Sequence, residues 1–190
     1  SFDFETKISA KLINEKTIVI NPKMQNILTE RGFGESEKDT LILNSFETLY
    51  LLYNDKLELK KINKDIVFDE LIQKYIQKND DILTQFLLYR DLRTKGYVVK
   101  DGFGFGSDFR VYERGNYGLK DAKFLIFGFN EGTRQKIGKL YKNIEEITKM
   151  GKEPIIAVIE RRGEIIYYKI NKMNFLENKP EFEMKDFNFN

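Results

Sequence analysis

The sequence predicts an α+β fold made of two small domains. Its 190 residues, of which 41% are hydrophobic and 14% aromatic, provide apolar surface for one large core or two small ones. Some apolar residues alternate, as in strands, and others recur every three or four positions, as in helices. Both kinds of segment occur before about residue 80, and the order α-β-β-β-α-β-β follows. We therefore expect a mixed α/β domain at 1–80, a second domain at 81–172 and a tail at 173–190.

Turn and cap residues define the elements of the first domain. The segment ISAKLINEKTIVI predicts two strands joined by a turn at Asn14-Glu15. Asn21 is the expected N-cap of a helix that begins with proline, and Asn44 with Glu47 forms a capping box for a second helix. The expected helices cover 22–31, the residues that follow Asn44, and 68–78, and a further strand covers 41–44.

In the second domain, one helix precedes three strands, and a second helix precedes two more. Asp80 or Asp81 is the expected cap of a helix that ends at Gly96, and a long helix begins at Thr133. The expected strands cover 97–100, 107–113, 123–129, 154–159 and 164–170, the last two joined by a tight turn at Arg162-Gly163. The tail contains a proline, alternating aromatic residues and several charges, which is typical of an extended arm or a partly disordered segment.

Composition excludes several classes of site. The chain has no cysteine and no histidine, so disulfides and thiolate metal sites are excluded, and any metal would need a carboxylate cluster that is not evident. We expect no metal and no other cofactor. The net charge of +2 permits contact with nucleic acid without demanding it. No apolar run is long enough to cross a membrane and no secretory signal is evident, so we expect a cytoplasmic protein.

Three glycines alternate in the segment DGFGFGSD. Gly102, Gly104 and Gly106 do not have the G-x-G-x-x-G spacing, and a strand follows instead of a helix, so no helix N-terminus is available for a pyrophosphate. We expect a hairpin connection in which the glycines permit positive φ angles. Phe103 and Phe105 would then cover the core or a partner.

Tyr112 and Lys152 are candidate site residues that also have ordinary interpretations. In SDFRVYE, Tyr112 lies on the polar face, opposite Phe109 and Val111, so the pattern alone favours a surface tyrosine. Lys152 directly precedes a strand that is apolar enough to be buried, and a lysine at such a junction is usually solvated. Neither residue indicates a site without further support.

Residues 89–115 read YRDLRTKGYVVKDGFGFGSDFRVYERG, which resembles the signature block of the archaeal tRNA-splicing endonucleases. Three more segments are similar to the same family in the same order: ISAKLINEKTIVI, SFETLYLLYNDKLEL and GKEPIIAVIERRGEIIYYKI. The resemblance covers nearly the whole chain before the tail. It implies a small N-terminal domain followed by a nuclease-like C-terminal domain with a mixed sheet flanked by helices.

The resemblance implies a metal-independent lyase that cuts precursor tRNA at bulge-helix-bulge splice sites, leaving a 2′,3′-cyclic phosphate and a 5′-hydroxyl. Family members use a tyrosine as base, a histidine as acid and a lysine that stabilises charge on the phosphorane. The family tyrosine falls on Tyr112 and the lysine on Lys152. The histidine position falls on Asp121, in the window DAKFL.

An aspartate in place of that histidine changes the expected activity. Aspartic acid ordinarily has a pKa near 3.9 and histidine near 6.5, so a carboxyl group at neutral pH is a poor proton donor and repels phosphate. Loss of general-acid catalysis costs about 10²–10⁴ in rate, roughly 3–5 kcal/mol. We therefore expect a structural subunit that is inactive alone. The alternatives are an active chain in which Asp121 or a partner residue supplies the proton, and an RNA-binding or assembly module without cleavage.

The resemblance also implies an assembly. Family members form from four identical chains, from two double-length chains, or from two catalytic and two structural chains. The expected partners are a catalytic splicing-endonuclease subunit and precursor tRNA, in a hetero-oligomer, with a homo-oligomer as the alternative. The last strand places one tyrosine on each face, which fits core packing with a half-exposed ring or an edge that pairs with a partner. The turn before it is of mixed charge, where the family has an acidic docking loop. The expected interface residues are Ile166, Tyr167, Tyr168, Arg161 and Arg162.

Overall fold

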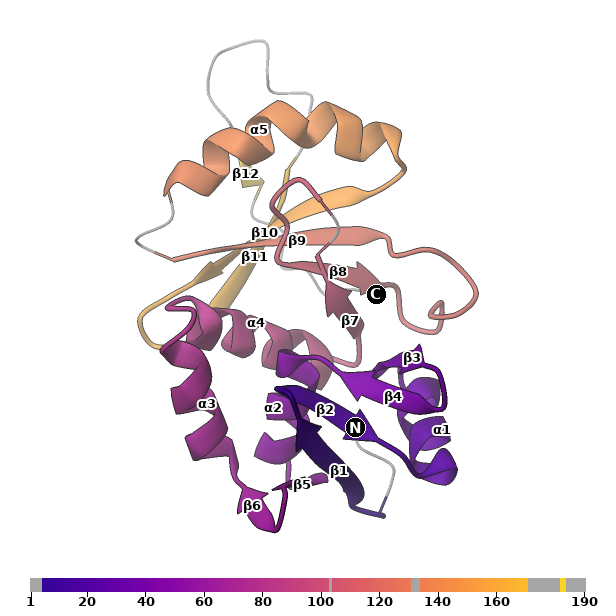
Figure 1. Ribbon diagram of the computed structural model, residues 1–190. Coiled ribbons are helices and arrows are strands. Elements are labelled where there is room, and N and C mark those ends of the chain that lie inside the picture. The colour runs from indigo at the N-terminus through magenta and orange to yellow at the C-terminus, as the bar shows by residue number, and fades with distance from the viewer. Residues whose placement is uncertain (1–4, 103, 131–133, 171–181, 184–190) are drawn as a thin grey trace. The chain divides into compact units, whose positions relative to one another are not determined.

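The computed structural model describes residues 5–102, 104–130, 134–170 and 182–183. The chain divides into two compact units, Ser1–Phe86 and Leu87–Asn190, and the division falls within helix α4 (Ile82–Thr94). Among the described residues each unit contains a six-stranded mixed sheet with helices, so the α+β class is confirmed (Figure 1). The expected boundary near residue 80 stays a prediction. The expected arm at 173–190 lies outside the described residues, apart from a two-residue strand.

The first unit has the strand order β3-β4-β2-β1-β5-β6. Strands β1 and β5 are parallel, and all other neighbours in this sheet are antiparallel. Its strands are β1 (Ile8–Ile13), β2 (Lys16–Val19), β3 (Glu35–Glu37), β4 (Thr40–Leu43), β5 (Leu57–Lys61) and β6 (Lys64–Ile66). Its helices are α1 (Pro22–Glu30), α2 (Ser45–Tyr53) and α3 (Phe68–Ile76).

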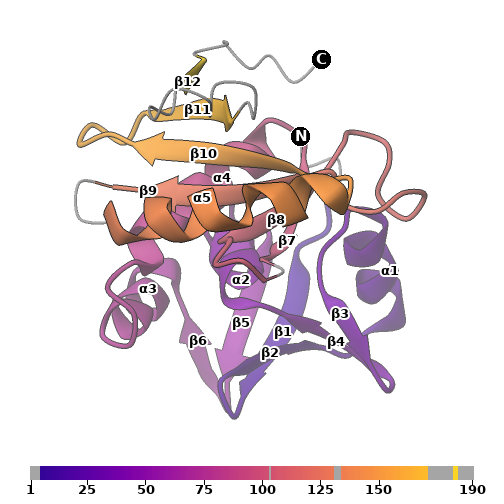
Figure 2. The ribbon, with the colours of Figure 1, turned by 90° about the horizontal axis from the view of Figure 1, so that it is seen from above.

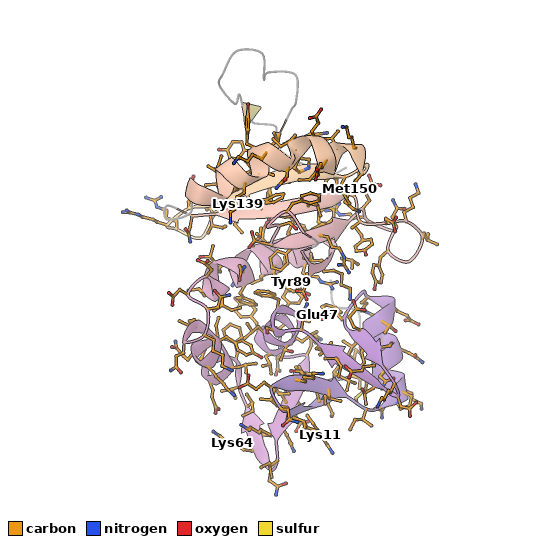
Figure 3. The ribbon with its side chains drawn as sticks, turned by 45° about the horizontal axis from the view of Figure 1, so that its top comes forward. Lys11, Glu47, Lys64, Tyr89, Lys139 and Met150 are labelled. Atoms are coloured by element: carbon orange, nitrogen blue, oxygen red, sulfur yellow. The ribbon has the colours of Figure 1, made fainter. Side chains whose placement is uncertain are left out.

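The predicted helix caps of this unit are confirmed. The Asn44 side chain accepts a hydrogen bond from the Glu47 N–H at 2.8 Å, and Glu47 Oε1 accepts from the Asn44 N–H at 3.0 Å. Glu47 Oε2 accepts from the Gly34 N–H at 2.7 Å. These bonds explain why a carboxylate that is only 1% exposed is tolerated here; Glu47 is labelled in Figure 3. Asn21 caps α1 by accepting from two backbone N–H groups.

Two of the tight hairpins of this unit use different turns. Between β1 and β2, Asn14 and Glu15 have φ angles of 49° and 64°, the pattern of a type I′ turn. Between β5 and β6, Ile62 has a φ of 59°, whereas Asn63 is not in the positive-φ region, the pattern of a type II′ turn. The first central position of that turn favours glycine, and a β-branched residue there is strained. The Ile62 side chain is also 89% exposed.

The second unit has the strand order β12-β11-β10-β9-β8-β7. Strands β9 and β10 are parallel and are connected through α5, whereas the other neighbours are antiparallel. Figure 1 shows α4 and α5 on opposite faces of this sheet, and Figure 2 shows α5 lying along β9 and β10. Its further elements are β7 (Val98–Asp101), β8 (Phe109–Tyr112), β9 (Phe124–Phe129), α5 (Arg134–Lys149), β10 (Glu153–Ile159), β11 (Ile165–Ile170) and β12 (Phe182–Glu183).

Alternate residues of β9 point toward the two helices. On the α4 side, Leu88 would lie 3.1 Å from a Cβ placed on Gly128, and the rings of Tyr89 and Phe109 pack at 5.7 Å. The opposite side is a buried cluster of β9, α5 and β10 residues: Leu125, Phe127, Phe129, Leu140, Ile144, Ile147 and Ile156. In its central part the sheet is therefore the middle of three layers.

The glycine-rich segment connects β7 to β8, as a hairpin connection should. Gly104 and Gly106 have the expected positive φ angles of 65° and 76°. The expectation was wrong for Gly102, which is needed for close approach instead: a Cβ there would lie 2.0 Å from the Ser107 carbonyl oxygen. Phe105 packs partly against the α5-side cluster, and Phe103 lies outside the described residues.

The last long strand is not a fully open edge. Strand β12 pairs with Lys169 and Ile170, so the expected edge of β11 is covered at its C-terminal end.

Two short strands of the first unit, β3 and β6, were not among the predicted elements. No helix in the described part of the chain is long and apolar enough to span a membrane.

Candidate active site

Tyr112, Asp121 and Lys152 lie at the same edge of the second sheet, where strands end or begin. Tyr112 is the last residue of β8, Asp121 lies three residues before β9, and Lys152 directly precedes β10. Strand β8 runs antiparallel to β9, whereas β10 runs parallel to it. The end of β8 and the beginnings of β9 and β10 therefore share an edge.

Backbone and side-chain hydrogen bonds tie this edge together. The Lys123 N–H donates to the Val111 carbonyl at 3.0 Å, which joins the segment after Asp121 to β8. Lys152 Nζ donates to the Ala122 carbonyl at 2.6 Å, which fixes the ammonium group beside the residue that follows Asp121. Asp121 itself is exposed. Whether the three side chains act together on a substrate stays a prediction.

Tyr112 has an aromatic neighbour that sequence reasoning missed. Its ring meets the Tyr117 ring edge-on, with centroids 5.0 Å apart and an interplanar angle of 88°. Lys100 Nζ lies 5.7 Å from the centroid of the Tyr117 ring, and Lys100 is only 3% exposed. Lys100 pairs with Arg110 across β7 and β8, which places it on the same sheet face as Tyr112. The sequence signal that could have indicated Tyr117 is its position between two turn glycines, Gly115 and Gly118.

The loop between β8 and β9 is closed by an ion pair. Lys123 Nζ donates to Glu113 Oε1 at 2.6 Å, and Asn116 Nδ2 donates to Glu113 Oε2 at 2.9 Å. The hydrogen bond from Lys123 lowers the pKa of Glu113 from its ordinary 4.5, and the same bond raises the pKa of Lys123 from its ordinary 10.5. The residue after Tyr112 is thus fastened to a residue near Asp121.

Two family models cover most of the chain. Residues 8–72 match the tRNA intron endonuclease N-terminal domain, and residues 82–167 match the tRNA intron endonuclease catalytic C-terminal domain. A tRNA-splicing endonuclease of Methanococcus vannielii is 32% identical over 164 residues, which is 86% of this chain and 93% of the relative.

The chain belongs to the tRNA intron endonuclease family. Two further relatives are also named tRNA-splicing endonuclease. That of Thermococcus onnurineus is 31% identical over 169 residues, 88% of this chain and 98% of the relative. That of Pyrococcus horikoshii is 26% identical over 152 residues, 80% of this chain and 88% of the relative. The resemblance to the archaeal endonucleases is therefore confirmed, and Tyr112, Asp121 and Lys152 all lie within the matched catalytic domain.

In this endonuclease-family chain, the two tyrosines of β11 have different surroundings. Tyr167 is 6% exposed and its hydroxyl donates to Asp91 Oδ2 at 2.6 Å, while Lys95 Nζ lies 2.8 Å from the same oxygen. Burial, with the Asp91 charge, raises the pKa of Tyr167 well above its ordinary 10. Tyr168 packs partly against the α5-side cluster. A partner can therefore reach Tyr167 only through its backbone.

The other expected interface residues lie before and within β11. Arg161 and Arg162 are exposed and line a hollow of about 530 Å³ at the carboxyl ends of β9 and β10, opposite the edge that carries Asp121. Ile166 is half-buried. Their contact with a partner chain stays a prediction. Among the residues that the structure describes, no group of three or more side chains could hold a metal ion.

Proposed function

We propose that this chain is a structural subunit of a tRNA intron endonuclease. The complex would cut precursor tRNA at bulge-helix-bulge splice sites without metal, leaving a 2′,3′-cyclic phosphate and a 5′-hydroxyl. The observation that carries the proposal is the carboxylate of Asp121 at the edge shared by Tyr112 and Lys152, in a chain without histidine. Family membership supports the RNA-cleaving complex.

The chemistry explains why this carboxylate matters. In the family reaction the 2′-oxygen forms a bond to phosphorus while the bond to the 5′-oxygen breaks. A base removes the proton of the 2′-hydroxyl, and an acid must give one to the departing 5′-oxygen. An ionised carboxylate has no proton to give and repels the phosphate. Lys152 can still supply positive charge, because its ammonium group is held at the sheet edge by the Ala122 carbonyl.

A second candidate is a chain that cleaves by itself. Two observations favour it: Tyr112 and Lys152 are both retained at the same edge, and the chain covers 93% and 98% of the length of two relatives named as endonucleases. In that case Asp121 or a partner residue would provide the proton.

The test compares single variants on a bulge-helix-bulge RNA. The unaltered chain alone is expected not to cut. Asp121→His restores a group that can donate a proton near neutral pH and is expected to raise cleavage by about 10²–10⁴. Asp121→Asn, which removes the charge without adding an acid, is the matched control and stays inactive. Adding Tyr112→Phe to Asp121→His is expected to abolish the restored cleavage.

Other outcomes identify the alternatives. If the unaltered chain cuts and Tyr112→Phe abolishes the cutting, the chain is an active enzyme. The second arm adds a histidine-containing catalytic subunit to the unaltered chain. Cleavage that requires both chains supports the structural subunit, whereas cleavage that does not depend on this chain leaves only an RNA-binding or assembly role.

A further inference from the structure

The loop at residues 113–120 has the composition of a surface that contacts RNA. It connects Tyr112 to Asp121 and carries Leu119, whose side chain is 80% exposed. Tyr117 is half-buried in the same loop, and Lys120 is exposed. A short loop that combines an aromatic ring, an exposed apolar side chain and a cation has the residue types on which unpaired nucleobases stack. Nothing within the described residues covers Leu119.

The backbone of this loop is held in place by hydrogen bonds and an ion pair. Its ends are joined by the Glu113–Lys123 ion pair, and the N–H groups of Leu119 and Lys120 donate to the Asn116 carbonyl at 3.0 Å and 2.9 Å. The Tyr117 ring is held edge-on to Tyr112. A binding surface that is already ordered loses little conformational entropy when a ligand arrives.

Asp121 adds a specific hydrogen-bonding preference to this surface. An ionised carboxylate only accepts hydrogen bonds, and its two oxygens can accept two parallel donors. Because it repels phosphate, the fitting RNA group is an uncharged base. Guanine presents two neighbouring donors, N1–H and the 2-amino group, on its Watson–Crick edge, whereas adenine, cytosine and uracil present one donor group each there.

We propose that residues 113–120 together with Asp121 form a binding site for one unpaired nucleobase, with guanine preferred. The base packs against Tyr117, Tyr112 and Leu119, and the carboxylate accepts from N1–H and the 2-amino group. The position that donates a proton in catalytic relatives thus reads a base in this chain. This inference rests on the proposed function, because it requires RNA to reach this edge of the sheet.

The experiment measures binding of the full chain to fluorescent adenylate heptamers that differ only at the central base. The heptamer with a central guanine is expected to bind about 5- to 100-fold more tightly than those with adenine, cytosine or uracil, the range for a bidentate base contact. Central inosine, which lacks the 2-amino group, is expected to lie between guanine and adenine. Asp121→Asn is expected to remove the preference.

Loop variants separate stacking from base reading. Tyr117→Leu is expected to weaken binding of every heptamer by a similar factor, about 5- to 100-fold, while Tyr117→Phe keeps the affinity. Tyr141→Leu, at a side chain that is 48% exposed on α5, is the matched control and leaves binding unchanged. Thermal unfolding checks that each variant folds.

Equal affinity for all central bases, a guanine preference that survives Asp121→Asn, or no binding of any heptamer would overturn the inference. Its failure is distinguishable from failure of the proposed function. A chain that binds without base preference yet supports cleavage with a catalytic subunit retains the function and loses the inference. A chain that has the guanine preference but gives no cleavage with any catalytic subunit retains the inference and loses the proposed function.

Discussion

The backbone around residue 121 is held by contacts that do not involve the Asp121 side chain. Lys152 Nζ bonds to the Ala122 carbonyl, and the Lys123 N–H bonds to the Val111 carbonyl. A histidine or an aspartate can therefore occupy this exposed position without altering the strands on either side. For this reason we expect Asp121→His to fold as well as the unaltered chain, so that a change in its activity reports on chemistry and not on stability.

Ile62 provides a stability prediction at a single residue. Ile62→Gly is expected to raise the free energy of unfolding by about 1 kcal/mol, because relief of about 1–2 kcal/mol of left-handed strain exceeds the entropy that glycine costs. Asn14→Gly is the control, because asparagine already tolerates its type I′ position, and a change below about 0.5 kcal/mol is expected. Urea unfolding measures both. A destabilised Ile62→Gly variant would mean that the isoleucine makes compensating contacts.

Sequence reasoning located single residues only where a local pattern or the family resemblance pointed to them. Alternation placed Tyr112 on the face opposite Phe109 and Val111, and both of those are buried. The same reasoning could not find Lys100 and Tyr117. Their contact joins residues 17 positions apart, one on β7 and one in the loop between β8 and β9, and no periodicity encodes such a contact. Tyr112, Asp121 and Lys152 were matched as site residues by resemblance alone.

At the scale of elements, long periodic segments with clear caps were predictable. The helices expected at 22–31 and 68–78 are α1 and α3, and each strand expected in the second domain has its counterpart. The missed strand β3 reads Glu35–Glu37, and all its residues are exposed, so it carries no hydrophobic alternation. Strand β6 has three residues, of which only Ile66 is buried. Such strands form because a neighbour offers backbone partners, which a pattern of side chains does not reveal.

The ion pair between Glu113 and Lys123 closes the loop between β8 and β9, and it predicts that the order of this loop depends on pH. Because the pKa of Glu113 is lowered in the folded chain, the contact is fully present above the ordinary value of 4.5 and is lost as the pH falls through the lowered value. The pKa of Lys123 is raised, so the contact persists below 10.5 and is lost only as the pH rises through the raised value.

Amide hydrogen exchange at residues 113–123, corrected for the intrinsic effect of pH, should therefore show constant protection between about pH 5 and 10 and a loss of protection in more acid solution. Glu113→Gln, which removes the charge, is expected to flatten the acid part of this profile. An unchanged acid loss in that variant would show that another group titrates.

At the scale of the whole molecule, the sheets of the two units share one design. Each sheet is mixed, with one parallel pair among antiparallel neighbours, and in the second unit that parallel pair is what brings the starts of β9 and β10 beside the end of β8. Composition and element order were enough to predict two α+β units. The strand order was not predictable from local pattern, because it depends on pairings between residues far apart in the chain.

Strand β12 leads to a prediction about assembly. A chain that ends at Ile170 lacks β12, so the edge of β11 at Lys169 and Ile170 is open for pairing. We expect this truncated chain to form more dimer than the full chain at equal concentration, as measured by sedimentation velocity. A truncated chain that is no more associated than the full chain would show that β11 is not the contact.

The small size of β12 also bears on how fast subunits join. A partner strand that pairs along the whole of β11 must displace β12 from Lys169 and Ile170. Association then begins when β12 detaches from β11. The rate of this detachment depends on a single chain and not on how often two chains collide. When subunits are mixed at rising concentration, the observed rate of complex formation should consequently level off at the frequency with which that short segment detaches.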